Sequence, residues 1–299
     1  DLGYALSSEA THVVLRNGNT VVCDPRFSSA TTRNMGAVWL IGTSGAIIGR
    51  LTGSQVNDGV CGSHEDPTDP EKFVSTNGIK VLPDGNVLIA SPEWQCTSGA
   101  SKCGAVTWMD GERGLGANVT VSYANSFVGS AKDDRVGSRV YALSNGDYIV
   151  QSQGKSISAA STTGALTYVK GGHSVSGTPT ASTSWTDVGL NPYSEGLTEL
   201  PSGDLVVTNP QWSGGRGAIT QIRRDVPFSG VVTSANSLTG SMPTDAVGSN
   251  GVRLLENGNY VVCSPGWNGQ RGAATWVDAA RPRSGESVSV VNSLIGKLV

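Results

Sequence analysis

Charge is scarce in this sequence. Only 15% of its residues are charged, and the formal net charge is -3 at pH 7. The 21 Lys and Arg residues are scattered along the chain and do not gather in one stretch. This pattern gives no electrostatic reason to expect a nucleic acid or an anionic membrane as a partner. No apolar run is long enough to cross a bilayer, so we expect no membrane insertion.

Helical periodicity and catalytic motifs are lacking as well. No segment shows a convincing helical period. None of the sequence patterns of a nucleophile elbow, a zinc protease or a phosphate loop is present. The three histidines, which share no neighbour pattern, are His12, His64 and His173. A glycosidase would need two carboxylates facing one bond, and Glu199 and Glu256 qualify only by being acidic. We therefore expect no enzyme, no metal and no cofactor.

The chain has five cysteines, and their positions predict disulfides. Cys96 and Cys103 flank one loop with no further Cys or His nearby, which favours a local disulfide in an oxidising compartment over a metal clip. Cys23 and Cys263 end apolar strands in corresponding places, where a small buried hydrophobe is the first interpretation. A bridge between Cys23 and Cys61 is an alternative. The absence of a signal peptide is compatible with a processed secreted protein and also with a shortened chain, and we expect an extracellular location.

The chain itself is a fivefold repeat. A turn glycine and a Gly-Ala pair recur in each copy, and each copy reads as four short strands. The turn glycines are Gly18, Gly85, Gly146, Gly203 and Gly258, and the pairs begin at Gly36, Gly104, Gly164, Gly217 and Gly272. The copies cover approximately 1–57, 58–133, 134–186, 187–244 and 245–299.

A second spacing suggests that the repeats close on themselves. Three apolar residues, Leu51, Phe127 and Leu238, each lie seven residues before an aspartate of an Asp-x-Val motif. The corresponding Leu294 lies near the end of the chain, and the sequence begins Asp1-Leu2-Gly3, which fits the next motif with about one residue missing. We therefore predict an all-β, five-bladed propeller of four-stranded antiparallel blades, with Asp1 close to Val299. An open β-solenoid is the alternative.

These motifs resemble a known repeat of unknown function. Asn-Ser-Leu-x-Gly, Asp-x-Val-Gly-Ser, Ser-Pro-x-Trp and Gly-Ala-Val-Thr-Trp look like the repeat of large exported bacterial proteins, including filamentous-haemagglutinin-type adhesins. The third copy departs most, since it lacks the Ser-Pro-x-Trp loop and the Asn-Ser-Leu element. The resemblance implies export and surface recognition, and it supplies no catalytic residues. The architecture also resembles five-bladed lectins of the tachylectin-2 type, an analogy of fold that does not establish function.

The loop between the second and third strands is the candidate binding site. It repeats an aromatic residue and a cation on one face, and such a pair suits a sugar ring that stacks through its C–H face and bonds through its hydroxyls. The candidate ligand-binding residues are Phe27, Trp94, Trp212, Trp267, Arg33, Lys102, Arg216 and Arg271. We expect a non-catalytic, multivalent carbohydrate-binding protein whose partners are glycans or cell-surface glycoconjugates, with an empty site in the third copy.

Structural interpretations compete with this one. The loop aromatics could instead be plugs that seal each blade, and the arginines could bridge neighbouring blades. The protein would then be a structural or protein-binding adhesive module without a sugar pocket. For the aspartates of the Asp-x-Val motifs, among them Asp58, Asp134, Asp187 and Asp245, a structural turn-capping role is favoured. Trp108 and Trp276 in the third strands are expected to lie in the core between blades.

Overall fold

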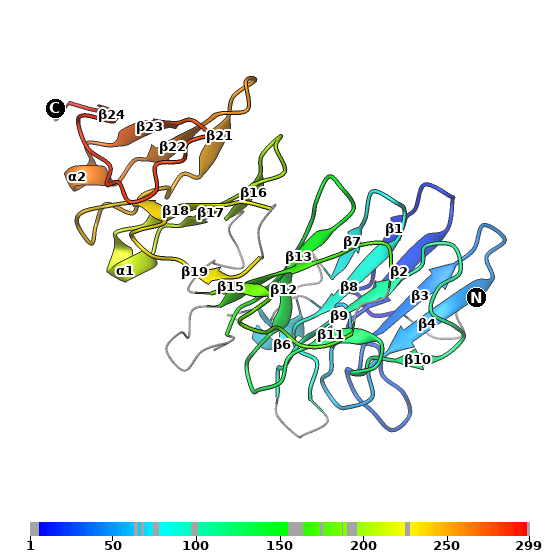
Figure 1. Cartoon of the computed structure of the whole chain (residues 1–299). Coiled ribbons are helices and arrows are strands. Elements are labelled where there is room, and N and C mark those ends of the chain that lie inside the picture. Colours follow the sequence, from blue (N-terminus) through cyan, green and yellow to red (C-terminus); the bar gives the residue numbers. More distant parts are fainter. Residues whose placement is uncertain are drawn as a thin grey trace. The chain divides into compact units, whose positions relative to one another are not determined.

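A computed structural model of the chain describes residues 6–62, 65–66, 69–73, 78–96, 101–154, 164–173, 176–186, 188–189, 196–224 and 228–297. Within these ranges the protein is all-β, with five sheets of four or five strands and two single-turn helices (Figure 1). The chain divides into two compact units, residues 1–156 with 166–180 and residues 157–165 with 181–299.

The first unit contains the sheets of the first and second repeats and three strands of the third. In each sheet the second strand lies between the first and third strands, as the short apolar runs and glycine turns predict. The first sheet comprises β1 (Thr11–Val14), β2 (Thr20–Asp24), β3 (Ala37–Ile41), β4 (Ile47–Thr52) and β10 (Val119–Thr120). The second comprises β7 (Ile79–Val81), β8 (Val87–Ser91), β9 (Ala105–Met109) and β11 (Ser126–Val128). The strands of the third repeat are β12 (Val136–Ala142), β13 (Tyr148–Ser152) and β14 (Ala165–Val169).

The second unit contains the sheets of the fourth and fifth repeats. The fourth repeat comprises β16 (Leu197–Glu199), β17 (Leu205–Asn209), β18 (Ala218–Ile222) and β20 (Ser237–Thr239). The fifth comprises β21 (Val252–Leu254), β22 (Tyr260–Ser264), β23 (Ala273–Val277) and β24 (Ser293–Ile295). Here β15 (Ser184–Thr186) pairs in parallel with β19 (Gly230–Val231), and the helices are α1 (Trp212–Gly215) and α2 (Trp267–Gln270).

A tight turn joins the first two strands of every repeat. Its glycine has a φ between 84° and 89° in all five copies, a region that L-residues with a Cβ rarely adopt. The glycine N–H donates to the carbonyl of a leucine three residues earlier, as from Gly18 to Leu15 at 3.0 Å and from Gly203 to Leu200 at 2.8 Å. The turns predicted from the recurring glycine are therefore confirmed.

The hydrophobic cores lie between consecutive repeats. In the first unit, Val38 and Leu51 of the first repeat pack in one cluster with Ile89 of the second. In the second unit, Ile219 and Leu238 of the fourth repeat pack with Val262 of the fifth. Since strand side chains alternate between faces, the sheets of one unit pack face to face on the neighbouring repeat of that unit. The repeats of a unit therefore stabilise one another by stacking.

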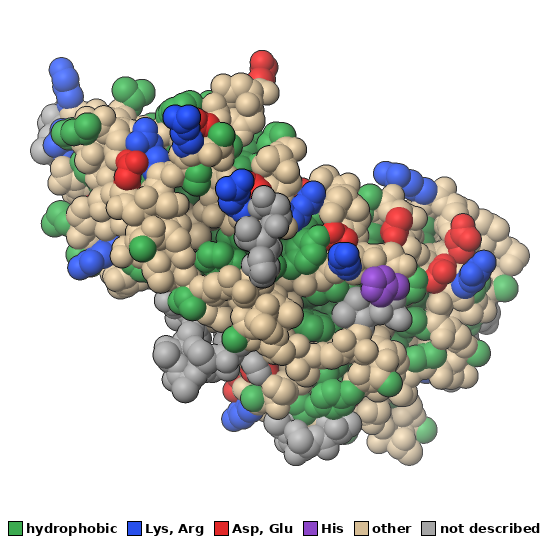
Figure 2. Space-filling view, viewed as in Figure 1, with side chains coloured by type: hydrophobic (Ala, Val, Ile, Leu, Met, Phe, Trp, Pro, Cys, Tyr) green, Lys and Arg blue, Asp and Glu red, His purple; other side chains and the backbone are tan. Residues whose placement is uncertain are grey.

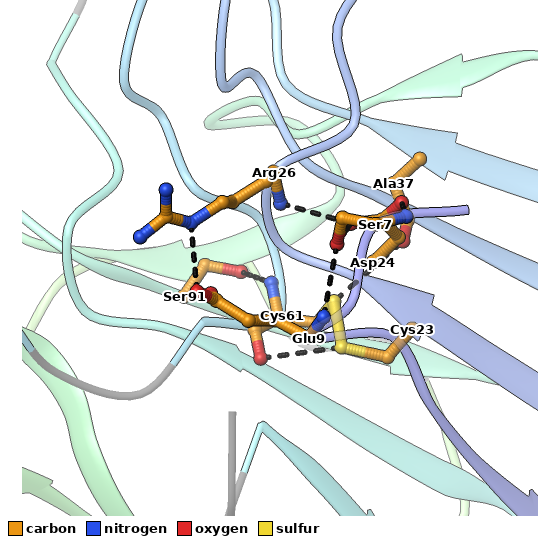
Figure 3. Close-up of a disulfide and its surroundings, with 8 residues drawn as sticks. All are labelled: Ser7, Glu9, Cys23, Asp24, Arg26, Ala37, Cys61 and Ser91. Carbon is orange, nitrogen blue, oxygen red and sulfur yellow. Dashed lines mark hydrogen bonds and ion pairs between the residues drawn. A yellow bond between two sulfur atoms is a disulfide. The ribbon is translucent and has the colours of Figure 1, made fainter. Parts of the chain in front are cut away.

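Two disulfides join parts of the first unit. Cys96 and Cys103 are bonded across their loop, and Cys23 at the end of β2 is bonded to Cys61 in the linker that leads to the second repeat (Figure 3). Ser91 accepts a hydrogen bond from the N–H of Cys61 at 3.1 Å and ties this linker to β8. Both predicted bridges are confirmed, and Cys263 is a half-buried free thiol rather than a buried side chain.

The linker after the first repeat and the two chain ends complete the description. The acidic insertion after the first repeat forms a small hairpin, β5 (Glu65–Asp66) with β6 (Asp69–Phe73). Asp1 and Val299, whose closeness would show closure of the ring, lie outside the described residues. The architecture established for the described residues is therefore five sheets of four or five strands and one small hairpin, in an all-β chain with almost no helix.

Candidate functional site

The structure buries three of the four candidate loop aromatics. Trp94 is 1% exposed and lies edge-on to Tyr123 with ring centroids 5.7 Å apart. Phe27 packs against Trp39, and the guanidinium of Arg50 lies 4.9 Å from the Phe27 ring centre. Trp267, the first residue of α2, is 7% exposed. Their position fits the plug interpretation, because a ring with so little exposed surface has almost none to offer a sugar.

Trp212 differs from the other three, since it is half-buried at the start of α1. Arg216, an exposed residue, follows it at the end of this short helix. Of the sequence-predicted site, this pair in the fourth repeat keeps both an aromatic surface and a cation within reach of solvent.

The remaining candidate cations have mixed environments. Lys102 lies 3.3 Å from the buried carboxylate of Glu93, which also pairs with Arg135 at 2.8 Å. Arg135 belongs to the linker that enters the third repeat, so this network connects two repeats of the first unit. Arg271 is half-buried and its Nε donates to the carbonyl of Gly296 at 3.2 Å, and Arg33 is exposed. Lys102 and Arg271 thus both make structural contacts.

The aspartates of the Asp-x-Val linkers cap turns, as predicted. Asp58 accepts hydrogen bonds from the backbone N–H groups of Ser54, Gln55 and Gln95 at 2.7–3.1 Å. Asp134 and Asp245 each accept two equivalent bonds at 2.8–2.9 Å from the turn before them. Burial raises the pKa of Asp58 above its ordinary 3.8, against the lowering effect of the three N–H donors. Asp187 lies outside the described residues.

The two tryptophans of the third strands also differ in burial. Trp108 is half-buried and packs against the cluster shared by the second and third repeats. Trp276 is 46% exposed, so the prediction that it lies in a core between blades is wrong. The reason is that no described residue of a later repeat lies over this face of the fifth sheet.

Sequence reasoning missed a polar hollow at the junction of the first and second repeats. It has a volume of about 360 Å³ and lies beside the turns that join first and second strands. Its lining residues are Leu15, Arg16, Asn17, Pro83, Asp84, Gly85, Asn86, Asp110, Gly111 and Glu112. Asn17 and Asn19 both donate to the carbonyl of Gly111, at 3.0 and 2.9 Å, and hold the junction together. The pKa of Asp110 is lowered, chiefly because its carboxylate accepts a hydrogen bond from the backbone N–H of Arg113. The lowered pKa keeps this carboxyl ionised.

A related hollow of about 560 Å³ lies at the junction of the fourth and fifth repeats. Its lining residues are Ser202, Asp204, Gln221, Arg223, Arg224, Ala279, Ala280 and Pro282. Gln221 donates to the carbonyl of Ala279 at 2.8 Å and to Asp204 at 3.0 Å. Both hollows combine the turn of the earlier repeat with the loop after the third strand of the later one, and in both a side-chain amide binds a carbonyl of that loop.

The two hollows present charged and amide groups at the surface, where they could bind a small hydroxylated ligand. The sequence gives only a weak indication of these hollows, because each is formed by residues of two different repeats. At the first junction, Asn17 of the turn and Gly111 of the loop are 94 positions apart. Among the described residues no group of three or more His, Cys, Asp or Glu side chains could hold a metal ion. Within the same ranges, no helix has the length and apolar character needed to span a membrane.

Sheets, turns and linkers thus define an all-β protein built from five copies of one repeat. A protein-family comparison matches the repeat of unknown function DUF5650 at residues 14–62, 81–138, 142–191, 199–249 and 254–298, and the chain belongs to this family. A solved structure of a protein of unknown function from Bacteroides caccae is 13% identical, with 98% of this chain and 84% of that chain covered and a TM-score of 0.32. A search of curated proteins finds no match.

Proposed function

We propose that this chain is a non-catalytic carbohydrate-binding protein whose sites lie at the junctions between consecutive repeats. The observation that carries the proposal is the recurrence, at two junctions, of a hollow lined by charged and amide side chains. Each offers cations and amides as donors and carboxylates as acceptors, the groups that sugar hydroxyls bind. On the face drawn in Figure 2 blue and red side chains are interspersed, which suits a neutral, hydroxyl-rich ligand better than a polyanion.

Variants of the chain can locate the site. Arg16→Ala and Arg223→Ala each remove an exposed side chain from one hollow, whereas Trp212→Ala removes the half-buried aromatic of the loop site. We expect a glycan array to identify a ligand for the unaltered protein, and isothermal titration to show fewer sites in either arginine variant. If only Trp212→Ala removes binding, the site is the loop pair Trp212 and Arg216. An array without any bound glycan contradicts the proposal.

A second candidate function is a structural or protein-binding adhesive module without a sugar pocket. The buried positions of Phe27, Trp94 and Trp267 favour it, since these rings seal loops. Exposed apolar side chains on the fifth sheet favour it too, because such a patch suits a protein surface. If this second function is correct, glycans should not bind. A pull-down with purified surface proteins should instead recover a partner protein, and substitution of Leu294 should abolish that binding.

Two finer features are proposed with the function. The five repeats with a common strand order support a closed five-bladed propeller, which small-angle scattering would test. The two disulfides are compatible with an oxidising extracellular compartment and support export. An association with adhesins rests on the sequence resemblance alone, and localisation of the protein in its native cells would test it.

A further inference from the structure

The hollow between the fourth and fifth repeats differs in charge from the hollow between the first and second. The first–second hollow is lined by one cation, Arg16, and by the three carboxylates of Asp84, Asp110 and Glu112. The fourth–fifth hollow is lined by two arginines and one carboxylate. A charged ligand that suits one hollow is therefore disfavoured by the other.

The carboxylate of the fourth–fifth hollow, that of Asp204, accepts hydrogen bonds from the protein itself. Its donors are the side-chain amide of Gln221 at 3.0 Å and the backbone N–H of Arg224 at 3.3 Å. The amide nitrogen of Gln221 also donates to the carbonyl of Ala279 at 2.8 Å, and its amide oxygen accepts from the hydroxyl of Tyr260 at 3.2 Å. Because these donors hold its one negative charge, the hollow offers a ligand more positive charge than negative.

The guanidinium of Arg224 is packed in place beside this hollow. It lies against the turn at Gly203, where an added Cβ would come within 2.7 Å of the Arg224 Cζ atom. Its Nη1 lies 3.6 Å from the carboxylate of Glu199, and the Arg224 side chain is 28% exposed. Nη1 is buried and makes no hydrogen bond within the described part of the chain. A ligand therefore meets a cation that is already ordered, which reduces the entropy cost of binding.

The fifth repeat gives the hollow an apolar wall. Ala279, Ala280 and Pro282 line it from the loop after β23, whereas the lining residues of the fourth repeat are all polar or charged. A pyranose ring has the same division, since its C–H groups pack on apolar surface and its polar substituents form hydrogen bonds. The volume of about 560 Å³ also lies in the range of roughly 300–1,000 Å³ that is usual for small-molecule sites. The hollow can therefore contact both parts of one sugar.

We propose that the fourth–fifth hollow binds a uronic acid, a sugar whose ring carries one carboxylate. The inference rests on the carbohydrate-binding function proposed above and names the class of sugar for one hollow. The guanidinium groups of Arg224 and of the exposed Arg223 donate to the carboxylate, and such charge-assisted pairs are stronger than neutral ones. The ring packs on the apolar wall of the fifth repeat. One carboxylate is compatible with the interspersed charges in Figure 2, which disfavour a polyanion.

The experiment is isothermal titration of the full chain with three probes. Methyl glucuronide and methyl glucoside share the pyranose ring and differ in the carboxylate, and acetate has a carboxylate without a ring. We expect methyl glucuronide to bind at least about tenfold more tightly than either of the other probes, because only it combines charge-assisted hydrogen bonds with ring contacts. A higher salt concentration should weaken the binding of methyl glucuronide, since salt screens the attraction between the arginines and the carboxylate.

Three variants locate the site. Arg223→Gln removes an exposed guanidinium, and Arg224→Lys keeps the positive charge but removes the planar pair of donors. Each should weaken the binding of methyl glucuronide by about tenfold. The matched control is Arg253→Gln, which removes an exposed arginine of the fifth repeat outside the hollow and should leave the affinity unchanged. Thermal unfolding of every variant separates a loss of binding from a loss of folding.

Each outcome decides the proposal. Methyl glucuronide that binds no better than methyl glucoside overturns the choice of a uronic acid, and acetate that binds as tightly as methyl glucuronide shows an anion site without sugar recognition. Binding of methyl glucuronide that neither Arg223→Gln nor Arg224→Lys weakens overturns the location in this hollow. The glycan array distinguishes the two proposals: bound glycans that are all neutral contradict the uronic-acid inference alone, whereas an array without any bound glycan contradicts the carbohydrate-binding function itself.

Discussion

The burial of Trp94 makes a quantitative prediction that separates a structural plug from a ligand contact. Trp94→Ala removes an indole ring that is 1% exposed and packs in the core shared by the first and second repeats. Its ring nitrogen has no hydrogen-bond partner within the described residues, so the loss is one of packing. Replacing a buried tryptophan by alanine costs about 3–5 kcal/mol of unfolding free energy.

The matched comparison is Trp212→Ala, which removes the same side chain from a half-buried position of the fourth repeat. Its cost should be clearly smaller, because much of the ring surface already contacts water. In a unit of roughly 150–250 residues, each kcal/mol of lost unfolding free energy lowers the melting temperature by roughly 2–4 °C. Trp94→Ala should therefore lower the melting temperature by roughly 6–20 °C.

The assay is thermal and urea unfolding of both variants, followed by circular dichroism, with glycan binding measured below the transition. A Trp94→Ala protein with unchanged stability would refute the packing argument. If that protein also failed to bind glycan at the first or second repeat, Trp94 would belong to a ligand site after all. A large loss of stability with retained binding supports the plug.

Three further predictions concern charge and cross-links. Replacing Cys23 and Cys61 by alanine should cost about 4 kcal/mol, from the 38-residue separation that the bridge spans, measured by urea unfolding against the oxidised wild-type protein. Because burial raises the folded-state pKa of Asp58, the contribution of this carboxyl to stability is largest below pH 3.8 and falls as pH rises through the folded pKa; Asp58→Asn should flatten this slope between pH 3 and 7. Burial also raises the pKa of Tyr148 and Tyr260, so ultraviolet titration should find that both phenols ionise at a higher pH in the folded protein than after unfolding.

The sequence alone determined the repeat, the turns and the local Cys96–Cys103 disulfide, whereas the Cys23–Cys61 bridge was only an alternative that the structure decided. Turn glycines such as Gly18 are required by a backbone geometry that is local, and local geometry can be read from a short motif. The continuous apolar run in strands such as β8 follows from burial on both faces. The role of Asp58 was predictable too, because a carboxylate that caps backbone N–H groups acts within a few residues of itself.

The tertiary structure alone decided which repeated residues are accessible. Trp94 and Trp212 occupy the same place in their repeats, yet one is buried and the other half-buried, because exposure depends on neighbours that are distant in the chain. Likewise, Leu294 and Leu51 share a motif, but only Leu51 has the next repeat packed upon it. The junction hollows join turns and loops of different repeats, and no periodicity within one repeat contains that information.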